Sequence, residues 1–138
     1  MQATMRQSLF PLLLLLAGIL VAAPSVSASS SGCTTAPRGI SCIDVHGSKL
    51  HVDTVRATRG KYSSDFICNY SARVFFQEPD GTIVTRDSGV VHNGACSTPY
   101  AWIDFHINAN FPNGTKVCTA FYESGQQQGG KPCEKIHS

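Results

Sequence analysis

The chain has 138 residues, and 14% of them are charged, giving a formal net charge of +2. Globular proteins usually carry nearer a quarter charged residues, and this chain has no basic or acidic block. The charge therefore gives no support for electrostatic binding of nucleic acid or of an anionic membrane surface. The length suits one domain of ordinary size.

The first residues have the pattern of a secretory signal peptide. Arg6 is the only charged side chain before an unbroken apolar run at 12–23. Val26 and Ala28 then occupy the positions that a signal peptidase reads. A membrane-spanning helix needs roughly 20 apolar residues, so this run is too short to be an anchor. We therefore predict a secreted protein with a cleaved signal peptide at 1–28, a flexible stretch at 29–32 and one disulfide-rich β-domain at 33–138.

A lipid anchor on Cys33 is the alternative for this region, because Gly32-Cys33 resembles a bacterial lipoprotein junction. Cys33 lies ten residues beyond the end of the apolar run, which is farther than such a junction normally lies. Lipidation would also leave an odd number of cysteines in an oxidising compartment. We therefore expect no stable membrane anchor.

Six cysteines follow the leader and indicate a disulfide framework. Successive cysteines are separated by 8, 25, 27, 21 and 14 residues, whereas a structural zinc site needs closely spaced ligand pairs. The sequence therefore predicts no metal and no cofactor. Closure between neighbours along the chain favours three bridges, with Cys68–Cys118 as the main alternative. The favoured bridges are Cys33–Cys42, Cys68–Cys96 and Cys118–Cys133.

The predicted secondary structure follows a period of two, which is typical of β-strands. A first strand is predicted at 49–58 from its β-branched content. The clearest strand is 66–77, in which every second residue should face the core: Phe66, Cys68, Tyr70, Ala72, Val74 and Phe76. The sequence Glu-Pro-Asp-Gly at 78–81 predicts a turn, and 82–91 should return antiparallel as a hairpin.

A second hairpin is predicted farther along the chain. Apolar and polar residues alternate at 103–108, and Asn-Gly at the end of 111–114 is a reliable hairpin dipeptide. The return strand would be 115–123. The tail at 124–138 is expected to form a loop fixed at Cys133, and no segment of the mature chain has a helical stripe.

These elements predict an all-β fold with five to seven strands. A small, disulfide-stapled antiparallel β-sandwich or a partly open barrel would bury one face of each sheet. An immunoglobulin-like topology is a further option, although its cysteine and tryptophan signature is absent. Trp102 lies 34 residues after Cys68, and Lys116 occupies the place of the usual tyrosine.

Two His/Asp pairs are the candidates for chemistry. His51 and Asp53 lie two apart on one predicted strand, and Asp104 and His106 lie two apart on another. Both members of each pair therefore share a face. If the strands pair, the four groups would converge on a metal ion or a water for general-base hydrolysis. The simpler interpretation is the polar surface of a solvated sheet.

Other features carry weaker signals. His92 lies in a predicted loop, and no nucleophile-elbow or zinc-protease motif is present in the sequence. Asn69 and Asn113 match the glycosylation sequon, but the turn already explains Asn113. Nothing in the sequence pairs the three carboxylates that glycoside hydrolysis would draw on. These are Glu78, Glu123 and Glu134.

Four aromatic residues would offer a platform for a sugar or a protein if they are exposed, although aromatic residues more often lie in a core. They are Tyr100, Trp102, Phe121 and Tyr122. The preferred hypothesis is a secreted, monomeric, non-catalytic domain that binds an extracellular protein, a glycan or a cell-envelope component. Its contact loops would be 62–65, 92–100 and 124–132. The alternative is a small secreted hydrolase that uses the His/Asp groups, with or without a metal.

Overall fold

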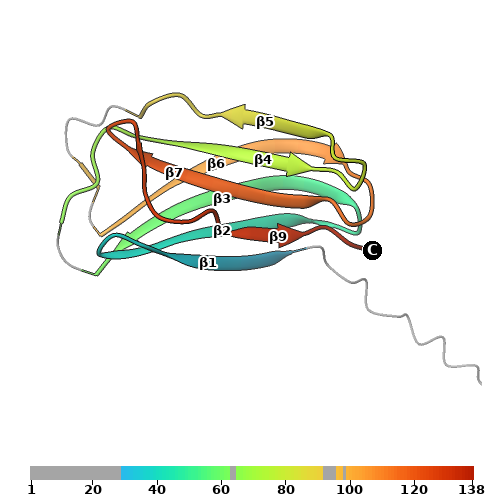
Figure 1. Ribbon diagram of the computed structural model, residues 1–138, viewed down its shortest axis with the longest axis horizontal. Helices are drawn as coiled ribbons and strands as arrows, with labels where there is room; N and C mark the ends of the chain where they lie inside the picture. The colour runs from blue at the N-terminus through green and yellow to red at the C-terminus, as the bar shows by residue number, and fades with distance from the viewer. Residues whose placement is uncertain (1–28, 63–64, 92–95, 98) are drawn as a thin grey trace, which may run out of the picture.

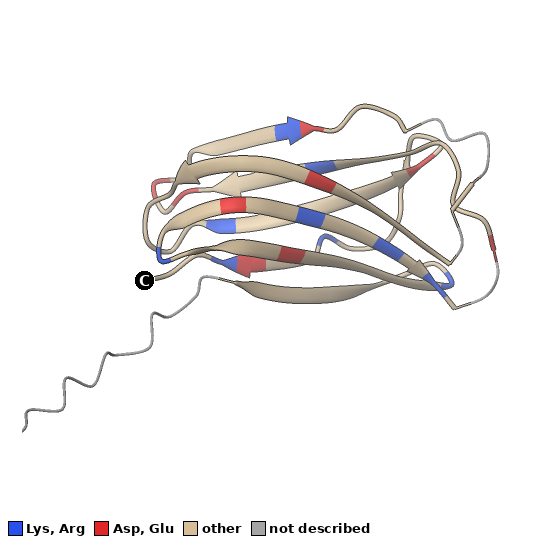
Figure 2. Cartoon of the chain, turned by 180° about the vertical axis from the view of Figure 1, so that it is seen from behind, with Lys and Arg blue, Asp and Glu red and all other residues tan. Residues whose placement is uncertain are grey.

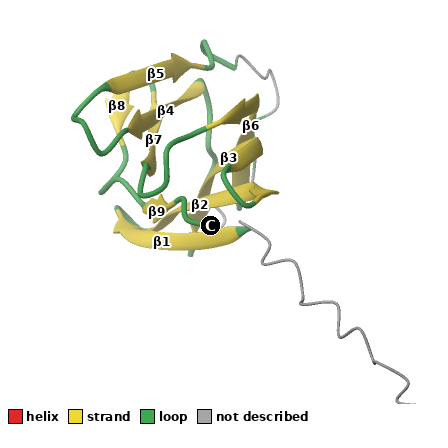
Figure 3. Ribbon diagram, turned by 90° about the vertical axis from the view of Figure 1, so that its right-hand side faces the viewer, coloured by secondary structure: helices red, strands yellow, loops and turns green. Residues whose placement is uncertain are grey.

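The computed structural model describes residues 29–62, 65–91, 96–97 and 99–138, and these residues contain no helix. Two antiparallel sheets pack against each other (Figure 3), which confirms the predicted all-β class. Nine strands are present in the described chain (Figure 1). They are β1 (Ser30–Ala36), β2 (Gly39–Ser48), β3 (His51–Lys61), β4 (Tyr70–Gln77), β5 (Ile83–Asp87), β6 (Tyr100–Asn110), β7 (Lys116–Glu123), β8 (Gln126–Gln127) and β9 (Cys133–Lys135).

The first sheet has the strand order β1-β2-β3-β6, and the second has the order β5-β4-β7-β8, with β9 also paired to β7. Neither sheet closes on itself, so the fold is an open sandwich and not a barrel. In an immunoglobulin domain the second and third strands lie in different sheets. Here β1 is an added edge strand, so the second and third strands of the remaining sandwich are β3 and β4, which do lie in different sheets. The pairings β2-β3-β6 and β4-β7-β9 match those of strands A-B-E and C-F-G, so the strand order agrees with the immunoglobulin-like option.

The alternation predicted for 66–77 holds only from Tyr70 onward. The inward residues of β4 are buried as expected. Before the strand the pattern is reversed, because Phe66 is 67% exposed and Ile67 is fully buried. Asn69 adopts a φ of 47°, which breaks the extended backbone and exchanges the two faces. The prediction that Phe66 faces the core was therefore wrong, and Cys68 is only half-buried.

The first predicted hairpin is confirmed. Gly81 N–H donates to the Glu78 carbonyl at 2.9 Å, and Gly81 has a φ of +92°, which glycine adopts without strain. The turn joins β4 directly to β5, and the two strands pair antiparallel. The return strand is shorter than predicted, because β5 ends at Asp87.

The second predicted hairpin does not form, although its turn does. Thr115 N–H donates to the Pro112 carbonyl at 3.1 Å, and Gly114 has a φ of +91°. The strands on either side belong to different sheets, since β6 pairs with β3 and β7 pairs with β4. The ring of Phe111 stacks on Phe76 with centroids 4.3 Å apart. This core contact guides the chain from one sheet to the other.

The two ends of the domain are more regular than predicted. Ser30 to Gly32 were expected to be flexible but pair with β2 as part of β1, because the strand register extends past Cys33. The tail was expected to be a loop, yet β8 and β9 both pair with β7. Cys133 fixes the tail as predicted.

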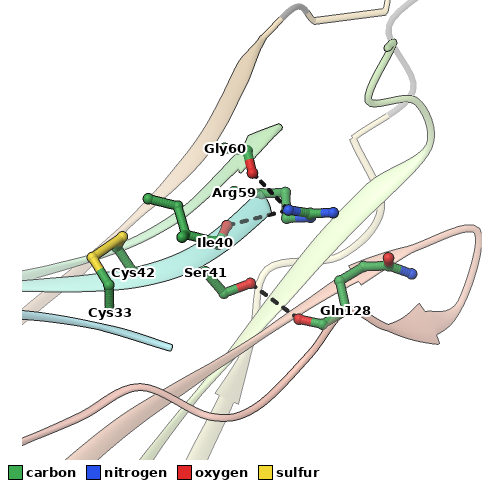
Figure 4. Close-up of a disulfide and its surroundings, with 7 residues drawn as sticks. All are labelled: Cys33, Ile40, Ser41, Cys42, Arg59, Gly60 and Gln128. Atoms are coloured by element: carbon green, nitrogen blue, oxygen red, sulfur yellow. Dashed lines mark hydrogen bonds between the residues drawn. A yellow bond between two sulfur atoms is a disulfide. The ribbon is translucent and has the colours of Figure 1, made fainter. Parts of the chain in front are cut away.

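The three disulfides are those that local closure favoured, and Cys68–Cys118 is not formed. Two of them join residues directly opposite each other on paired strands. The third joins the segments that lead into β4 and β6, and so ties the entries to the two sheets. Figure 4 shows one cross-strand bridge, with Ser41 on the opposite side of β2 pointing to Gln128.

Arg59 is the largest fully buried side chain in the described chain, and it connects the sheets. Its Nε donates to Glu123 Oε1 at 3.0 Å, which joins β3 to β7. Its Nη groups donate to the carbonyls of Gly60 and Pro37. Lys61 Nζ donates to the second oxygen of Glu123 at 2.8 Å. The buried guanidinium is thus paired and hydrogen-bonded, as a buried charge requires.

Removing the bridges one at a time should destabilise the protein in the order of the loops that they close. The bridges Cys33–Cys42, Cys118–Cys133 and Cys68–Cys96 close loops with sequence separations of 9, 15 and 28. Each bridge is removed by a paired Cys→Ser variant. Loop-closure entropy predicts losses of about 2.5, 3 and 3.5 kcal/mol in the free energy of unfolding. Urea denaturation of the three variants measures the order. The largest loss from the Cys33–Cys42 variant would contradict this account.

Arg59→Ala should lower the free energy of unfolding by about 3–5 kcal/mol, because it leaves Glu123 with Lys61 alone and removes the donor of three carbonyls, those of Pro37, Ile40 and Gly60. Arg73→Ala is the matched control, since Arg73 is exposed and pairs with Asp87 on the neighbouring strand of the same sheet. We expect its loss to stay within about 0.5 kcal/mol. Equal losses in the two variants would show that the buried bonds of Arg59 contribute no more to stability than a surface ion pair.

Candidate functional site

The two His/Asp pairs lie on neighbouring strands but do not converge. In the register of β3 and β6, His51 is opposite Asn110, whereas His106 is opposite Thr54. Asn110 and His106 are four residues apart on β6, which corresponds to about 13 Å along the strand. The predicted joint site of His51, Asp53, Asp104 and His106 is therefore not formed.

His51 is held by residues of β6 beside a β-bulge. Its Nδ1 lies 3.0 Å from Asn110 Oδ1, and its Nε2 lies 3.1 Å from Asn108 Oδ1. Asp53 Oδ1 lies 3.4 Å from the same Nε2. The register shifts between Val52 and Thr54, which turns Asp53 toward the histidine. Both ring nitrogens therefore face oxygen atoms of neighbouring side chains.

Asp104 is held in a two-point ion pair with Arg56. Arg56 Nε donates to Oδ1 at 2.7 Å, and Nη2 donates to Oδ2 at 2.9 Å. The hydrogen bonds from Arg56, followed by its charge, lower the pKa of Asp104, and the same bonds raise the pKa of Arg56. A carboxylate with a lowered pKa is a weaker base, so this aspartate is poorly suited to general-base catalysis.

No group of three or more His, Cys, Asp or Glu side chains in the described ranges is placed to hold a metal ion. Glu123 is already bound to Arg59 and Lys61. His92 lies outside the described residues, as do positions 63–64, 92–95 and 98 of the predicted contact loops. The part of the chain that the structure describes holds no helix long and apolar enough to cross a membrane.

The predicted aromatic platform is divided between the surface and the core. Tyr100 and Trp102 are each 55% exposed, on the outer side of β6. Phe121 is buried and stacks on Tyr70, with centroids 5.5 Å apart, and Tyr122 is half-buried on the other sheet. Only Tyr100 and Trp102 therefore offer exposed rings on one face.

The strand register of the first sheet determines which residues lie beside these two rings. Tyr100 is opposite Gly60, which is opposite Ile40, and Trp102 is opposite Thr58, which is opposite Cys42. We call these outward residues, with the Cys33–Cys42 bridge, the aromatic face. The next row on the same side consists of Asp44, Arg56 and Asp104, and we call it the polar row.

One edge of the Tyr100 ring lies close to Gly60. A Cβ atom added at Gly60 would lie 2.8 Å from Tyr100 Cε1 and 3.1 Å from its Cδ1. The same Cβ would lie 3.4 Å from Ile40 Cγ1. Any side chain at position 60 would therefore displace the ring. One edge of the ring rests against the sheet, and the rest of it is open to solvent.

Trp102 connects the aromatic face to the polar row. The Arg56 guanidinium carbon lies 5.7 Å from the centroid of the Trp102 ring, within the range of a cation–π contact. The same guanidinium is held by Asp104. Arg56 is thus fixed from two sides, and it restricts the orientation of the indole.

The second sheet carries a weaker candidate. An open hollow of about 250 Å³ is lined by Ser71, Ala72, Arg73, Asp87, Gly89, Val90, Tyr122 and Gly125. It contains an ion pair like that of the polar row, since Arg73 Nη2 donates to Asp87 Oδ2 at 2.9 Å, but the described residues that line it include no pair of exposed aromatic rings. The hollow is smaller than a typical ligand pocket. We therefore regard the aromatic face and the polar row as the candidate site.

Sequence reasoning missed Asp44, Arg56 and Gly60 as members of this site, because only the register brings Arg56 and Gly60 beside β6 and Asp44 beside Arg56. One sequence signal was available for β6 itself. Its even-numbered residues from 100 to 110 are exposed, whereas the odd-numbered residues from Ala101 to Ile107 are buried. This strict alternation places Tyr100 and Trp102 on the same face as Asp104.

Comparisons of this chain with protein-family models, with curated proteins and with solved structures gave no significant match.

The ion pair makes a prediction about pH. Because the pKa of Asp104 is lowered by Arg56, its carboxylate should titrate below the ordinary value of about 3.9. The pair then contributes its full stability above that ordinary value and loses it as the pH falls through the lowered pKa. Carboxyl NMR titration measures the midpoint. Arg56→Met should move it upward, toward the ordinary value.

Arg73→Met is the matched control for that titration. Arg73 holds Asp87 in the same two-point manner on the second sheet and lowers its pKa. The control should shift the Asp87 midpoint and leave that of Asp104 unchanged. An unchanged Asp104 midpoint in Arg56→Met would contradict the role assigned to Arg56.

Proposed function

We propose that this protein is an extracellular, non-catalytic binding domain whose contact surface is the aromatic face and the adjoining polar row. The observation that carries the proposal is the exposure of Tyr100 and Trp102, each 55%, side by side on one strand. Three disulfides support an oxidising, extracellular setting.

The core is formed without these two rings, so their exposure does not follow from core packing. Tryptophan is highly buried on average, and the same strand already buries Ala101, Ile103 and Phe105 on its inner side. Tyrosine and tryptophan are the residues that contribute most to binding energy at recognition surfaces. Their position here therefore favours recognition over stability.

The surface is also fixed before it meets a ligand. Tyr100 rests against Gly60, and Trp102 is restrained by Arg56, which is itself paired with Asp104. The Cys33–Cys42 bridge ties β1 to β2 in the same face. A surface that is already ordered loses little side-chain entropy on binding.

The test is retention of the mature protein on cell-envelope and extracellular material from its native setting. Replacing Tyr100 and Trp102 together by serine should weaken retention about tenfold or more, equivalent to ~1.4 kcal/mol or more of binding free energy. Ile83→Ser is the matched control, because Ile83 is 59% exposed on β5 of the other sheet. It should bind like the unchanged protein.

Circular dichroism and thermal unfolding would verify that both variants remain folded. Equal retention of the unchanged protein and the double variant would show that the aromatic face is not the contact surface. Absence of retention for the unchanged protein would count against a binding function.

A further inference from the structure

We infer that the ligand of this surface is a neutral glycan, with sugar rings stacked on Tyr100 and Trp102 and hydroxyl groups bonded to the polar row. The inference rests on the proposed binding function and adds the chemical class of the ligand. It follows from three features of the face: the pose of the rings, the chemistry of the neighbouring row and the balance of charge.

The pose of Tyr100 suits stacking. One edge of its ring lies against Gly60, so the sheet restrains the ring while the residue stays 55% exposed. A pyranose presents a face of C–H groups, which packs against such a ring by dispersion and apolar contact. Trp102 is two residues farther along the same strand, about 7 Å away. That distance is on the scale of one sugar ring, so one glycan chain can contact both residues.

The polar row supplies what sugar hydroxyls need. Asp44 and Asp104 carry carboxylate oxygens that accept hydrogen bonds, and Arg56 between them carries N–H donors. The Arg56–Asp104 pair fixes two of these groups in position. The pKa of Asp104 is lowered by its hydrogen bonds with Arg56, so its oxygens remain acceptors in mildly acidic surroundings.

The charge on this surface favours a neutral ligand over an anionic one. The guanidinium of Arg56 is matched by Asp104, and Asp44 adds a negative charge on the other side. Charged residues of both signs are interspersed along the strands, without a block of one sign (Figure 2). An acidic or sulfated glycan would be repelled by the two carboxylates, and no cationic cluster on this face would attract it.

A protein partner fits the face less well. The exposed apolar part consists of two rings, Ile40 and one disulfide, and the charged row lies directly beside it. A stable protein interface buries about 800 Å² on each partner and has few charged residues at its centre. Here the carboxylates of Asp44 and Asp104 lie in the row next to the rings, and aspartate is depleted from such centres.

The chain contains one tryptophan, so its tryptophan emission, excited at wavelengths that tyrosine does not absorb, reports on Trp102 alone. The probes are cellohexaose, chitohexaose and laminarihexaose in solution, and insoluble cellulose, chitin and β-1,3-glucan in sedimentation assays. At least one neutral glycan should shift the emission of Trp102 saturably and protect it from quenching by acrylamide. The soluble and insoluble arms distinguish a single glycan chain from a packed polysaccharide surface.

Single substitutions should distinguish stacking on the two rings from non-specific binding. Calorimetry with Trp102→Ala and Tyr100→Ala should show affinity reduced about tenfold or more, whereas Trp102→Phe should lose less because it keeps an aromatic ring. Gly60→Ala should weaken binding with both rings retained, because its Cβ displaces Tyr100. Phe66→Ala is the matched control, since Phe66 is 67% exposed outside the strands and should have no effect.

Salt gives an independent readout. Affinity for a neutral glycan should change little between about 0.1 M and about 1 M salt, because no ion pair forms on binding. Alginate, an acidic glycan, should not bind. Binding of alginate in preference to the neutral probes would overturn the inference.

Failure of the glycan inference differs from failure of the proposed function. If envelope material retains the protein through Tyr100 and Trp102, and this retention survives periodate oxidation of sugars but not protease digestion, the ligand is a protein. The binding function then stands and the glycan inference falls. If no neutral glycan alters Trp102 and no envelope material retains the protein, both fall.

Discussion

The buried ion pair of Arg59 with Glu123 is the interaction on which the arrangement of the two sheets depends. A guanidinium with no exposed surface persists only where every donor finds an acceptor, and here the acceptors come from β7 and from neighbouring carbonyls. Because side chains alternate along a strand, burial of Arg59 fixes which side of β3 faces outward. Arg56 and Gly60 then lie on the outer side, beside the rings of β6. The candidate site and the junction of the sheets are therefore two faces of the same strand.

The disulfides act differently from this pair. Cys33–Cys42 and Cys118–Cys133 join strands that already pair, and so they stiffen the sheets without placing one against the other. Cys68–Cys96 fixes the segments that lead into β4 and β6. Such bridges let a small domain keep its outer sheet face rigid while its core remains modest in size. That rigidity is what a flat recognition surface requires, since ordering on contact would lower affinity.

Predictions from the sequence succeeded where neighbours along the chain decide the structure. The turn at 78–81 and the three short-range bridges are examples. They failed where distant residues compete for the same strand. The Asn-Gly turn before Thr115 formed, but β6 pairs with β3, and the partly buried Phe111 stacks on Phe76 of the core. Likewise the left-handed backbone of Asn69 reversed the faces of Phe66 and Ile67, which alternation by itself does not reveal. A strand of serine, threonine and glycine such as β1 gives little hydrophobic signal at all.

By itself, then, the sequence determined the all-β class and the turn at 78–81, and it favoured the three short-range bridges, because each follows from local periodicity or short loops. The tertiary structure decided the site. It separated His51 from His106 and joined Arg56 to Asp104, two residues 48 positions apart. It also placed Gly60 against Tyr100. These outcomes depend on the strand register. The register is selected because one complete face of each strand is buried against the other sheet, and a local sequence pattern does not specify which register achieves this.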